Sequence, residues 1–365
     1  MPIRRTTKLL ALLLALGLIA AACSSDGDST ATAEPADEAA AETADEAPAE
    51  TADDGDDGAV EAEPASDRGG VAYFSYANFN GFSQGIWTGV QEGAANAGIE
   101  AEIFDGAFDF SGETQAQQIQ NATLSGDFDT FVISSNNGAA LIPGVEEAIA
   151  EGIAVVAVFA PIGPDFLTLD PQIDGLIFAG QSTLGAVEAQ VDLVIQACEG
   201  INPCNVQYLI GIPTLDLDVA RTDHFEMLIE AEDNLVLLDS VAGGYSVEEG
   251  IAAGDAVFLA QGQVDVMVGS AQAILGAEEA AIAAGVEGVA FIGAGSPTQA
   301  VEAVNEGRWF GLQVDRTADW GRIAVEVASE ELAGNNPNPS VDLDDLGDLF
   351  VTQETIGDFQ GQWTN

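Results

Sequence analysis

The sequence has very few basic residues. Lysine and arginine together number 8 in 365 residues, against 61 aspartates and glutamates, which gives a formal net charge of −53. Lys8 is its single lysine. So negative a chain repels nucleic acids and anionic lipid surfaces, because both carry a dense negative charge. Neither is therefore expected as a partner.

Histidine and cysteine are also scarce, with one and three residues respectively. His224 has no second histidine or cysteine near it, whereas a metal site needs several such ligands at close spacing. We therefore expect no metal and no cofactor, and we interpret His224 as a structural or surface residue.

Familiar catalytic signals are missing too. No Gly-x-Gly-x-x-Gly follows the first expected strand, and no P-loop is present. Gly293 and Gly295 form a lone Gly-x-Gly fragment, which fits a tight strand-to-helix turn. Carboxylates are so abundant that no pair of them identifies an acid–base couple. Because nothing nominates a reaction, we expect the protein not to be an enzyme.

Residues 1–22 have the features of an export signal peptide. Three basic residues precede an apolar run over 9–22, which is too short and too early to be a membrane-spanning helix of the mature protein. The run ends in Ala-Ala-Ala-Cys and resembles a bacterial lipoprotein signal with Cys23 as the lipidated residue. We therefore expect a lipid-anchored protein on the outer face of the cytoplasmic membrane, at the cell surface or in the periplasm.

Residues 23–68 are expected to form an acidic, disordered tether. From Ser24 to Asp67 the chain carries 16 acidic residues, no aromatic residue and, among the larger aliphatic side chains, only Val60. Such a segment cannot bury enough apolar surface to offset the entropy lost on ordering. The globular part is therefore expected to begin near Gly69.

Export also bears on the two remaining cysteines. Cys198 and Cys204 flank the short segment EGINP. In an exported protein, two cysteines at this range favour a disulfide over a metal site. We expect this disulfide to join the end of a helix to the next strand.

From residue 71 onward, short apolar runs alternate with amphipathic stretches. Residues 71–76 are β-branched and aromatic, and Ile86, Val90 and Ala94 then follow at helical spacing, with Ser83 as the expected N-cap and Gly98 as the stop. Strands are expected at 71–76, 99–104, 130–133, 154–159, 176–180, 206–212, 236–241, 264–268, 289–292, 309–314 and 349–352. Helices are expected at 83–97, 112–124, 139–150, 184–197, from 218, and at 247–259, 271–284 and 317–333.

This alternation predicts an α/β fold. Continuous apolar runs followed by amphipathic helices are typical of parallel strands in βαβ units, and about ten strands with eight helices exceed one core. We therefore expect two α/β lobes. Because ligands bind at the carboxyl ends of such strands, Asn80, Phe82 and Trp87 are expected near a small molecule. Core packing is the alternative for Phe82 and Trp87, and for Trp87 it is an equal one.

The globular part resembles the periplasmic sugar-binding proteins of the ribose/galactose-binding, or type I, family, which are the substrate-binding components of ABC importers. The resemblance rests on Asn80-Gly81-Phe82 and, in order, on WTGVQEGAANAG, AGQSTLGAVEAQ, ARTDHF, VGSAQAILGAEEAAIAAG and AVEAVNEGRWFGLQVDRTADWG. It implies two Rossmann-like lobes with parallel sheets, joined by three crossings near Gly180, Asp315 and Asp348. The N-terminal lobe would hold 69–180 plus 316–348, and the C-terminal lobe 181–315 plus 349–365.

The resemblance also implies a ligand held between the lobes. Asn80 and Phe82 match a hydrogen-bonding residue and an aromatic wall, and Arg221 matches an arginine that bonds sugar hydroxyls. The alternative for Arg221 is a surface ion pair with Asp218 or Asp223. The candidate ligand-binding residues are Asn80, Phe82, Asn136, Phe159, Arg221, Tyr245, Ser270, Gln272, Ser296 and Asp315.

The chain departs from the family pattern at three strand ends. Phe159-Ala160 replaces an Asp-Arg pair, Ser270-Ala271-Gln272 replaces an Asn/Asp pair, and Gly295 replaces an Asp. Each lost charged group removes hydrogen bonds worth roughly 1.5–3 kcal/mol. The ligand is therefore expected to be smaller, less hydroxylated or more apolar than a pentose or hexose held in the family's usual way.

The function implied is that of a monomeric lipoprotein that captures a sugar or sugar-like neutral solute and delivers it to ABC permease subunits. The alternative is a ligand-sensing protein of the same fold that acts through a membrane receptor. A repressor of related fold would need a basic helix-turn-helix, where this chain has a signal peptide and an acidic tether. A cleft hydrolase would need a nucleophile with a base beside it, and the sequence gives no sign of such a pair.

Overall fold

The computed structural model describes residues 69–77, 79–106, 110–260, 262–335 and 337–365. The expected signal peptide, the lipidation site Cys23 and the acidic tether lie outside the described residues. Within them, no helix is both long and apolar enough to cross a membrane.

The first sheet is fully parallel, with the strand order β12-β5-β4-β3-β1-β2. Its strands are β1 (Gly70–Phe74), β2 (Glu100–Phe104), β3 (Thr130–Ile133), β4 (Ala154–Val158), β5 (Leu176–Gly180) and β12 (Ser340–Asp342). The order reverses between β1 and β3, and the crevice at such a reversal is where ligands bind in open α/β sheets. We call this sheet with its helices the N-terminal lobe.

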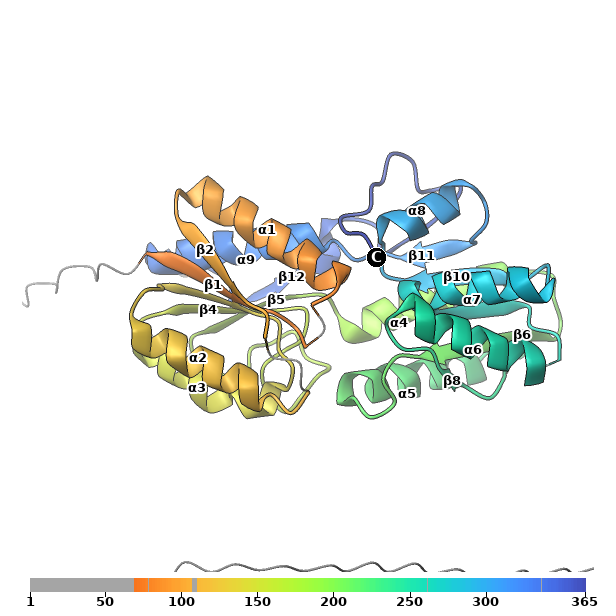
Figure 1. Ribbon diagram of the computed structural model, residues 1–365, viewed down its shortest axis with the longest axis horizontal. Coiled ribbons are helices and arrows are strands. Elements are labelled where there is room, and N and C mark those ends of the chain that lie inside the picture. The colour runs from red at the N-terminus through yellow and green to blue at the C-terminus, as the bar shows by residue number, and fades with distance from the viewer. Residues whose placement is uncertain (1–68, 78, 107–109, 261, 336) are drawn as a thin grey trace, which may run out of the picture. The chain divides into compact units, whose positions relative to one another are not determined.

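Helices cover both faces of this sheet. Helices α1 (Gly81–Ala97) and α9 (Thr317–Leu332) lie on one face, and α2 (Glu113–Ser125) and α3 (Gly138–Ala150) lie on the other (Figure 1). Strand β4, AVVAV, is buried along its whole length. Its continuous apolar run follows from this double covering, since a strand with one wet face alternates instead.

The second sheet has the order β13-β11-β10-β9-β6-β7, with β8 beside β6. Its strands are β6 (Cys204–Ile210), β7 (Leu235–Leu237), β8 (Val241–Ala242), β9 (Val266–Ser270), β10 (Ala290–Ala294), β11 (Gly311–Gln313) and β13 (Phe350–Thr352). All pairs are parallel except β11 with β13.

This sheet too is covered on both faces. Helices α4 (Thr183–Ala197) and α5 (Asp216–Glu230) pack on one face, and α6 (Val247–Ala260), α7 (Ala271–Ala284) and α8 (Thr298–Asn305) pack on the other. We call this sheet with its helices the C-terminal lobe. The predicted fold class, two α/β lobes with parallel sheets, is confirmed.

The chain passes between the two lobes three times. It leaves the first sheet after β5, returns after β11 to form α9 and β12, and leaves again through the 3-10 helix η1 (Leu343–Leu346) to end with β13. Three short segments of the chain therefore connect the two lobes. In proteins built this way, hinge motion between lobes is absorbed by a few residues of such connecting segments.

Several local predictions were wrong. Asn80, not Ser83, caps α1, because its Oδ1 accepts from the N–H groups of Phe82 at 3.1 Å and Ser83 at 3.4 Å. The single strand expected at 236–241 is split into β7 and β8, which pair with different parts of β6. Helix α8 and strand β12 were not predicted, since one is a short helix and the other a short polar edge strand without an apolar run.

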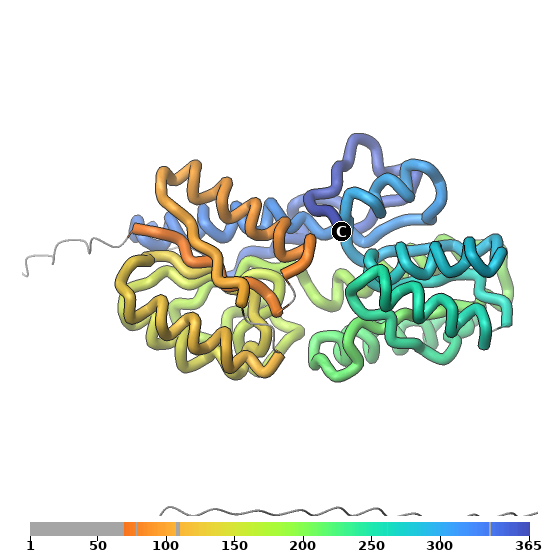
Figure 2. Tube along the Cα trace, in the orientation of Figure 1, coloured from red at the N-terminus to blue at the C-terminus, as the bar shows by residue number. Residues whose placement is uncertain are grey.

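Helices α1 and α9 lie side by side although they are far apart in sequence (Figure 2). Gly85, Gly89 and Gly93 recur every fourth residue along the face of α1 that meets α9. A Cβ atom added at Gly89 would lie 1.8 Å from the carbonyl oxygen of Ala318, and one at Gly321 would lie 2.1 Å from that of Ile86. Only glycine allows so close a helix contact at these positions.

The expected disulfide is present. Cys198 at the end of α4 and Cys204 at the start of β6 are bonded, with Cα atoms 5.8 Å apart, and both are fully buried. The bond joins a helix end to the next strand.

Candidate ligand-binding site

The main cavity lies where the carboxyl ends of strands from both lobes meet. It holds about 1100 Å³ of space free of protein atoms, including its opening to solvent. The N-terminal lobe contributes Tyr76, Asn80, Phe82, Phe159 and Trp320. The C-terminal lobe and the crossings contribute Gln181, Tyr208, Asp218, Arg221, Tyr245, Ser270, Gln272, Gln313, Asp315 and Trp363, among others.

Most of the predicted site residues come together here. Asn80, Phe82, Phe159, Arg221, Tyr245, Ser270, Gln272 and Asp315 all line the cavity. Asn136 instead lines a neighbouring pocket. Ser296 is fully buried and holds the backbone of Asp315, since its hydroxyl donates to the Asp315 carbonyl at 2.8 Å and accepts from the Asp315 N–H at 3.2 Å.

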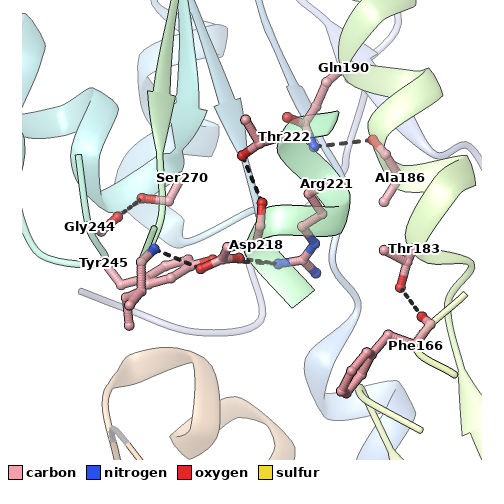
Figure 3. Close-up of polar contacts among 11 residues, drawn as sticks. Phe166, Thr183, Ala186, Gln190, Asp218, Arg221, Thr222, Gly244, Tyr245 and Ser270 are labelled. Atoms are coloured by element: carbon pink, nitrogen blue, oxygen red, sulfur yellow. Dashed lines mark hydrogen bonds and ion pairs between the residues drawn. The ribbon is translucent and has the colours of Figure 1, made fainter. Parts of the chain in front are cut away.

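Asp218 organises the polar side of the cavity (Figure 3). It lies in the first turn of α5, and its side chain is 3% exposed. The Tyr245 hydroxyl donates to Oδ1 at 2.6 Å, and the Ile212 N–H donates to Oδ2 at 2.8 Å. A carboxylate near a helix N-terminus is also stabilised by the helix dipole. Asp218 was not among the predicted ligand residues.

Arg221, one turn further along α5, completes this cluster. Its Nη1 lies 3.3 Å from Asp218 Oδ1, and its side chain is 23% exposed. The ion pair that was the alternative interpretation therefore exists, but it is part of the cavity wall rather than of the outer surface. Arg221 both pairs with Asp218 and faces the space that a ligand would occupy.

Burial and neighbouring charges keep Tyr245 protonated and Arg221 positively charged. Burial raises the pKa of Tyr245 well above its usual value, and the Asp218 carboxylate raises it further, so the hydroxyl remains a donor. Burial disfavours the charged form of Arg221, but the negative charges of the Asp218 and Asp315 carboxylates favour it, and the pKa of Arg221 lies above its usual value. Arg221 therefore stays positive at any ordinary pH.

Asp315 is a second carboxyl group in the cavity, and its pKa is raised. Burial raises its pKa to about 6, although Gln313 donates to Oδ1 at 2.9 Å and the positive Arg221 opposes the shift. Gln313 Nε2 is also 3.2 Å from Gln181 Oε1, so side chains from two crossings are linked beside Asp315.

Phe159 forms the aromatic wall with a strained backbone. Its φ is +69°, and the Ala160 N–H donates to the Val158 carbonyl at 2.8 Å, which is the rarer and more strained of the two γ-turn forms. Such conformations persist where the surroundings impose them, often at functional sites. The ring makes edge contacts with Phe82 at 4.9 Å and with Tyr76 at 5.5 Å between centroids.

Sequence reasoning missed the tryptophans of the site. Trp320 from α9 and Trp363 near the C-terminus each lie 6.0 Å from the Phe82 ring centroid. Neither tryptophan lies at or just after the end of an expected strand, as Asn80, Phe159 and Ser270 do. Trp87, by contrast, stacks on Tyr73 at 6.0 Å and packs against the core, so core packing is correct for this residue.

One catalytic pattern was also overlooked. Residues 81–85 read GFSQG, which matches the Gly-x-Ser-x-Gly spacing of a nucleophile elbow. An elbow exposes its serine on a strand-to-helix turn, whereas Ser83 is fully buried in the first turn of α1. Among the described residues, no group of three or more His, Cys, Asp or Glu side chains is arranged to hold a metal ion.

A two-lobed α/β fold with a cavity lined from both lobes defines a class of proteins that enclose a small molecule between lobes. The chain belongs to the family described as periplasmic binding protein domain, whose model matches residues 71–336. This family consists of extracytoplasmic substrate-binding proteins of transporters rather than enzymes.

Solved structures with the same fold include solute-binding proteins of ABC transporters. One from Bacillus halodurans, with bound myo-inositol, has a TM-score of 0.70 at 18% identity and covers 82% of this chain and 99% of its own. One from Actinobacillus succinogenes, with bound D-allose, has a TM-score of 0.69 at 19% identity, covering 79% and 99%. A periplasmic ribose ABC transporter protein from Conexibacter woesei has a TM-score of 0.63 at 18% identity, covering 81% and 95%. No curated protein matches the chain.

Proposed function

We propose that the protein is the substrate-binding component of an ABC importer and that it binds a sugar or a sugar-like neutral solute. The observation that carries this proposal is the cavity itself. Aromatic rings from both lobes surround a hydrogen-bonding cluster of Asp218, Arg221 and Tyr245. Binding sites of this kind hold the apolar faces of a ligand against rings and orient its hydroxyls with a few fixed polar groups.

The charges of the cavity support a neutral ligand. Arg221 is the one cation among the residues that line it, and it is already paired with Asp218. Asp315 adds a second carboxylate. An anionic ligand would therefore meet one cation already neutralised by Asp218 and one further carboxylate, within a chain of strong negative charge.

Asn80 and Arg221 are proposed to approach the ligand from opposite lobes. The Asn80 Oδ1 already caps α1, so its amide nitrogen is the group proposed to donate to a ligand hydroxyl. The Arg221 guanidinium carries more N–H donors than the contact with Asp218 uses. A ligand bonded by both side chains would favour the closed arrangement of the lobes, because it contacts both lobes only there.

A thermal-shift screen tests this proposal. D-Allose, D-ribose and myo-inositol are the first neutral probes, and D-galacturonate is the anionic control. A ligand at 100 times its Kd stabilises the folded protein by about 2.7 kcal/mol, which gives a readily measured rise in Tm. Stabilisation by the anionic control but by no neutral sugar or polyol would contradict the proposed ligand class.

Delivery to a permease is the second part of the proposal. Uptake of the labelled ligand into vesicles that contain the cognate permease should require this protein. The alternative role, sensing through a membrane receptor, would leave uptake unchanged and abolish a ligand-dependent signal instead.

Cys23 is proposed to anchor the protein, because it follows an export signal in a lipoprotein-like context. Cys23→Ala should move the protein from the membrane fraction to the medium or periplasm, and it should remove labelling by radioactive palmitate. Ser24→Ala is the matched control and should stay in the membrane fraction. Membrane retention of Cys23→Ala would contradict lipid anchoring.

A further inference from the structure

A second pocket adjoins the main cavity. It holds about 620 Å³ of space free of protein atoms, including its opening. The two pockets share Tyr76 and Leu217 as lining residues, one from each lobe, so they lie directly beside each other. The second pocket also contains Asn136, the predicted ligand residue that the main cavity does not include.

Ser135 places an unused hydroxyl in the second pocket. The residue is 3% exposed, and within the described part of the chain its Oγ has no hydrogen-bond partner. A buried hydroxyl without a partner costs about 1–3 kcal/mol. A ligand hydroxyl that bonds to Ser135 in this pocket would recover this cost.

The backbone on both sides of Ser135 is held rigidly. Gln115 Nε2 donates to the Ser134 carbonyl at 2.9 Å, and Gln115 Oε1 accepts from the Asn136 N–H at 2.9 Å. Gln115 is itself fully buried. The hydroxyl is therefore presented to the pocket by a fixed scaffold, which lowers the entropy lost when a ligand binds.

Helix α3 begins in the same pocket. Its N-cap Asn137 and its first residue Gly138 both line the space. The first N–H groups of a helix have no partners within the helix, so they favour an acceptor such as a hydroxyl oxygen. Together with Ser135, this end of α3 offers both donors and acceptors.

The remaining walls of the second pocket combine rings with neutral polar groups. Phe110 and Phe166 supply aromatic surface, and Thr214 supplies a hydroxyl. Asp216 is the charged residue among those that line it. Aromatic surface, hydroxyls and one carboxylate without a cation suit a hydroxylated, uncharged ring and disfavour a phosphate or carboxylate group.

We propose that the ligand has two joined rings, that the main cavity holds the first, and that the second pocket, built around Ser135 and the start of α3, holds a second hydroxylated ring. The ligand class is then a neutral disaccharide, which differs from the smaller or less hydroxylated ligand expected from the sequence because the second pocket adds room and polar groups. This inference rests on the proposed function, since it extends the same binding cleft.

Isothermal titration of the purified protein compares monosaccharides with disaccharides. The probes are D-glucose, D-allose and D-ribose on one side, and maltose, cellobiose, trehalose and sucrose on the other, with p-nitrophenyl β-D-glucoside as a ligand whose second ring is apolar. At least one disaccharide should bind with a Kd at least tenfold lower than every monosaccharide.

Two variants then locate the second ring. Thr214 is exposed at the rim, so Thr214→Trp should fill the second pocket without unfolding the protein. It should raise the disaccharide Kd at least tenfold and leave the monosaccharide Kd within twofold. Ser135→Ala should raise the disaccharide Kd about fivefold. Ser329→Ala, on α9 with its hydroxyl bonded to the Val325 carbonyl, is the control and should change neither.

The outcomes separate this inference from the proposed function. If monosaccharides bind and no disaccharide binds more tightly, the second subsite is refuted and the proposed function stands. Tighter binding of the aryl glucoside than of every disaccharide refutes a hydroxylated second ring. If no sugar in either group binds, both the inference and the proposed sugar ligand are refuted. Equal losses for both ligand classes in Thr214→Trp would also overturn the separate subsite.

Discussion

Arg221 of helix α5 lies over the ring of Phe159, with its guanidinium carbon 5.7 Å from the ring centroid. The two residues belong to different lobes, and both line the main cavity. Contacts of this kind contribute about 0.5–1 kcal/mol at partly exposed sites. The arginine that pairs with Asp218 therefore also touches the aromatic wall of the opposite lobe.

Replacing Phe159 should affect binding more than folding. Phe159→Leu keeps most of the apolar volume but removes the ring face, so ligand affinity should fall about tenfold, whereas Tm should fall by a few degrees at most. Phe178→Leu is the matched control, because Phe178 is a buried core ring of β5 outside the cavity. It should lower Tm and leave affinity unchanged. Titration calorimetry measures the ligand affinity of each variant, and melting curves measure its Tm. Unchanged affinity in Phe159→Leu together with a large fall in its Tm would contradict a binding role for Phe159.

Removing Arg221 should weaken both binding and stability. Arg221→Ala leaves ligand acceptors without a donor in a desolvated cleft, which should cost about 2–5 kcal/mol of binding free energy. It also leaves the buried Asp218 carboxylate without its cation, so the free energy of unfolding should fall by about 1–3 kcal/mol.

The double variant Asp218→Asn/Arg221→Ala separates these effects. It should recover much of the lost stability, because no unpaired carboxylate remains, but it should not recover affinity. Urea unfolding and calorimetry supply the two measurements. A double variant as unstable as the sum of its parents would show that the two side chains do not interact energetically.

Asp315 should make stability depend on pH. Its pKa is about 6 in the folded protein against 3.8 for the free side chain, so the unfolded chain releases its proton first as pH rises. The free energy of unfolding should therefore fall between about pH 4 and pH 6. Asp315→Asn should remove this slope and stabilise the protein by about 1–2 kcal/mol at pH 7, a figure reduced for partial exposure.

The control for Asp315 is Asp255→Asn, which changes an exposed carboxylate on α6. It should retain the pH dependence of the unaltered protein. Urea unfolding measured from pH 4 to pH 8 makes the comparison, and an unchanged slope in Asp315→Asn would refute the assignment.

The contact between α1 and α9 should not tolerate a side chain at Gly89. A Cβ there would lie 1.8 Å from the Ala318 carbonyl oxygen, so the helices would have to separate. Gly89→Ala should destabilise the protein by about 1–3 kcal/mol, which is typical of overpacking. Gly262→Ala is the control, because nothing lies within 4 Å of its added Cβ. Equal Tm values for the two variants would contradict this close packing.

The disulfide should contribute modestly to stability. It closes a short loop, with a sequence separation of 6, so the entropic gain should be about 2 kcal/mol. The double variant Cys198→Ala/Cys204→Ala should lose this stabilisation of about 2 kcal/mol and therefore melt at a lower Tm. Dithiothreitol should lower the Tm of the unaltered protein but not that of the variant. Alkylation and intact-mass analysis check the bond directly, and two freely alkylated thiols in the native protein would contradict it.

Much of the fold could be predicted from the sequence because its signals are local. Strands β3 and β5 and helix α7 lie where the apolar runs and helical spacing predicted them. The errors occur where another nearby residue or a long-range contact overrides a local sequence rule. Ser83 is a good capping residue, but Asn80 forms the cap three residues earlier. Strand β12 carries no apolar run, because its place at the sheet edge depends on pairing with β5 rather than on burial.

The sequence by itself determined the strong negative charge, the alternation of strands and helices, the doubly covered sheets and the close pairing of two cysteines. Each follows from composition or from neighbours within a few residues. The candidate site was predictable only where a residue follows a strand, as Asn80, Phe159 and Ser270 do.

Only the tertiary structure decided which carboxylate pairs with Arg221, which aromatic rings meet Phe82, and that Asn136 lies in a second pocket. Asp218 could not be selected from so many acidic residues until the fold buried it beside Tyr245. Trp363 contacts Phe82 although most of the chain separates them in sequence. Asn136 and Thr214 line one pocket only because the two lobes face each other. Contacts between residues so far apart depend on how the lobes pack, and no local spacing encodes that packing.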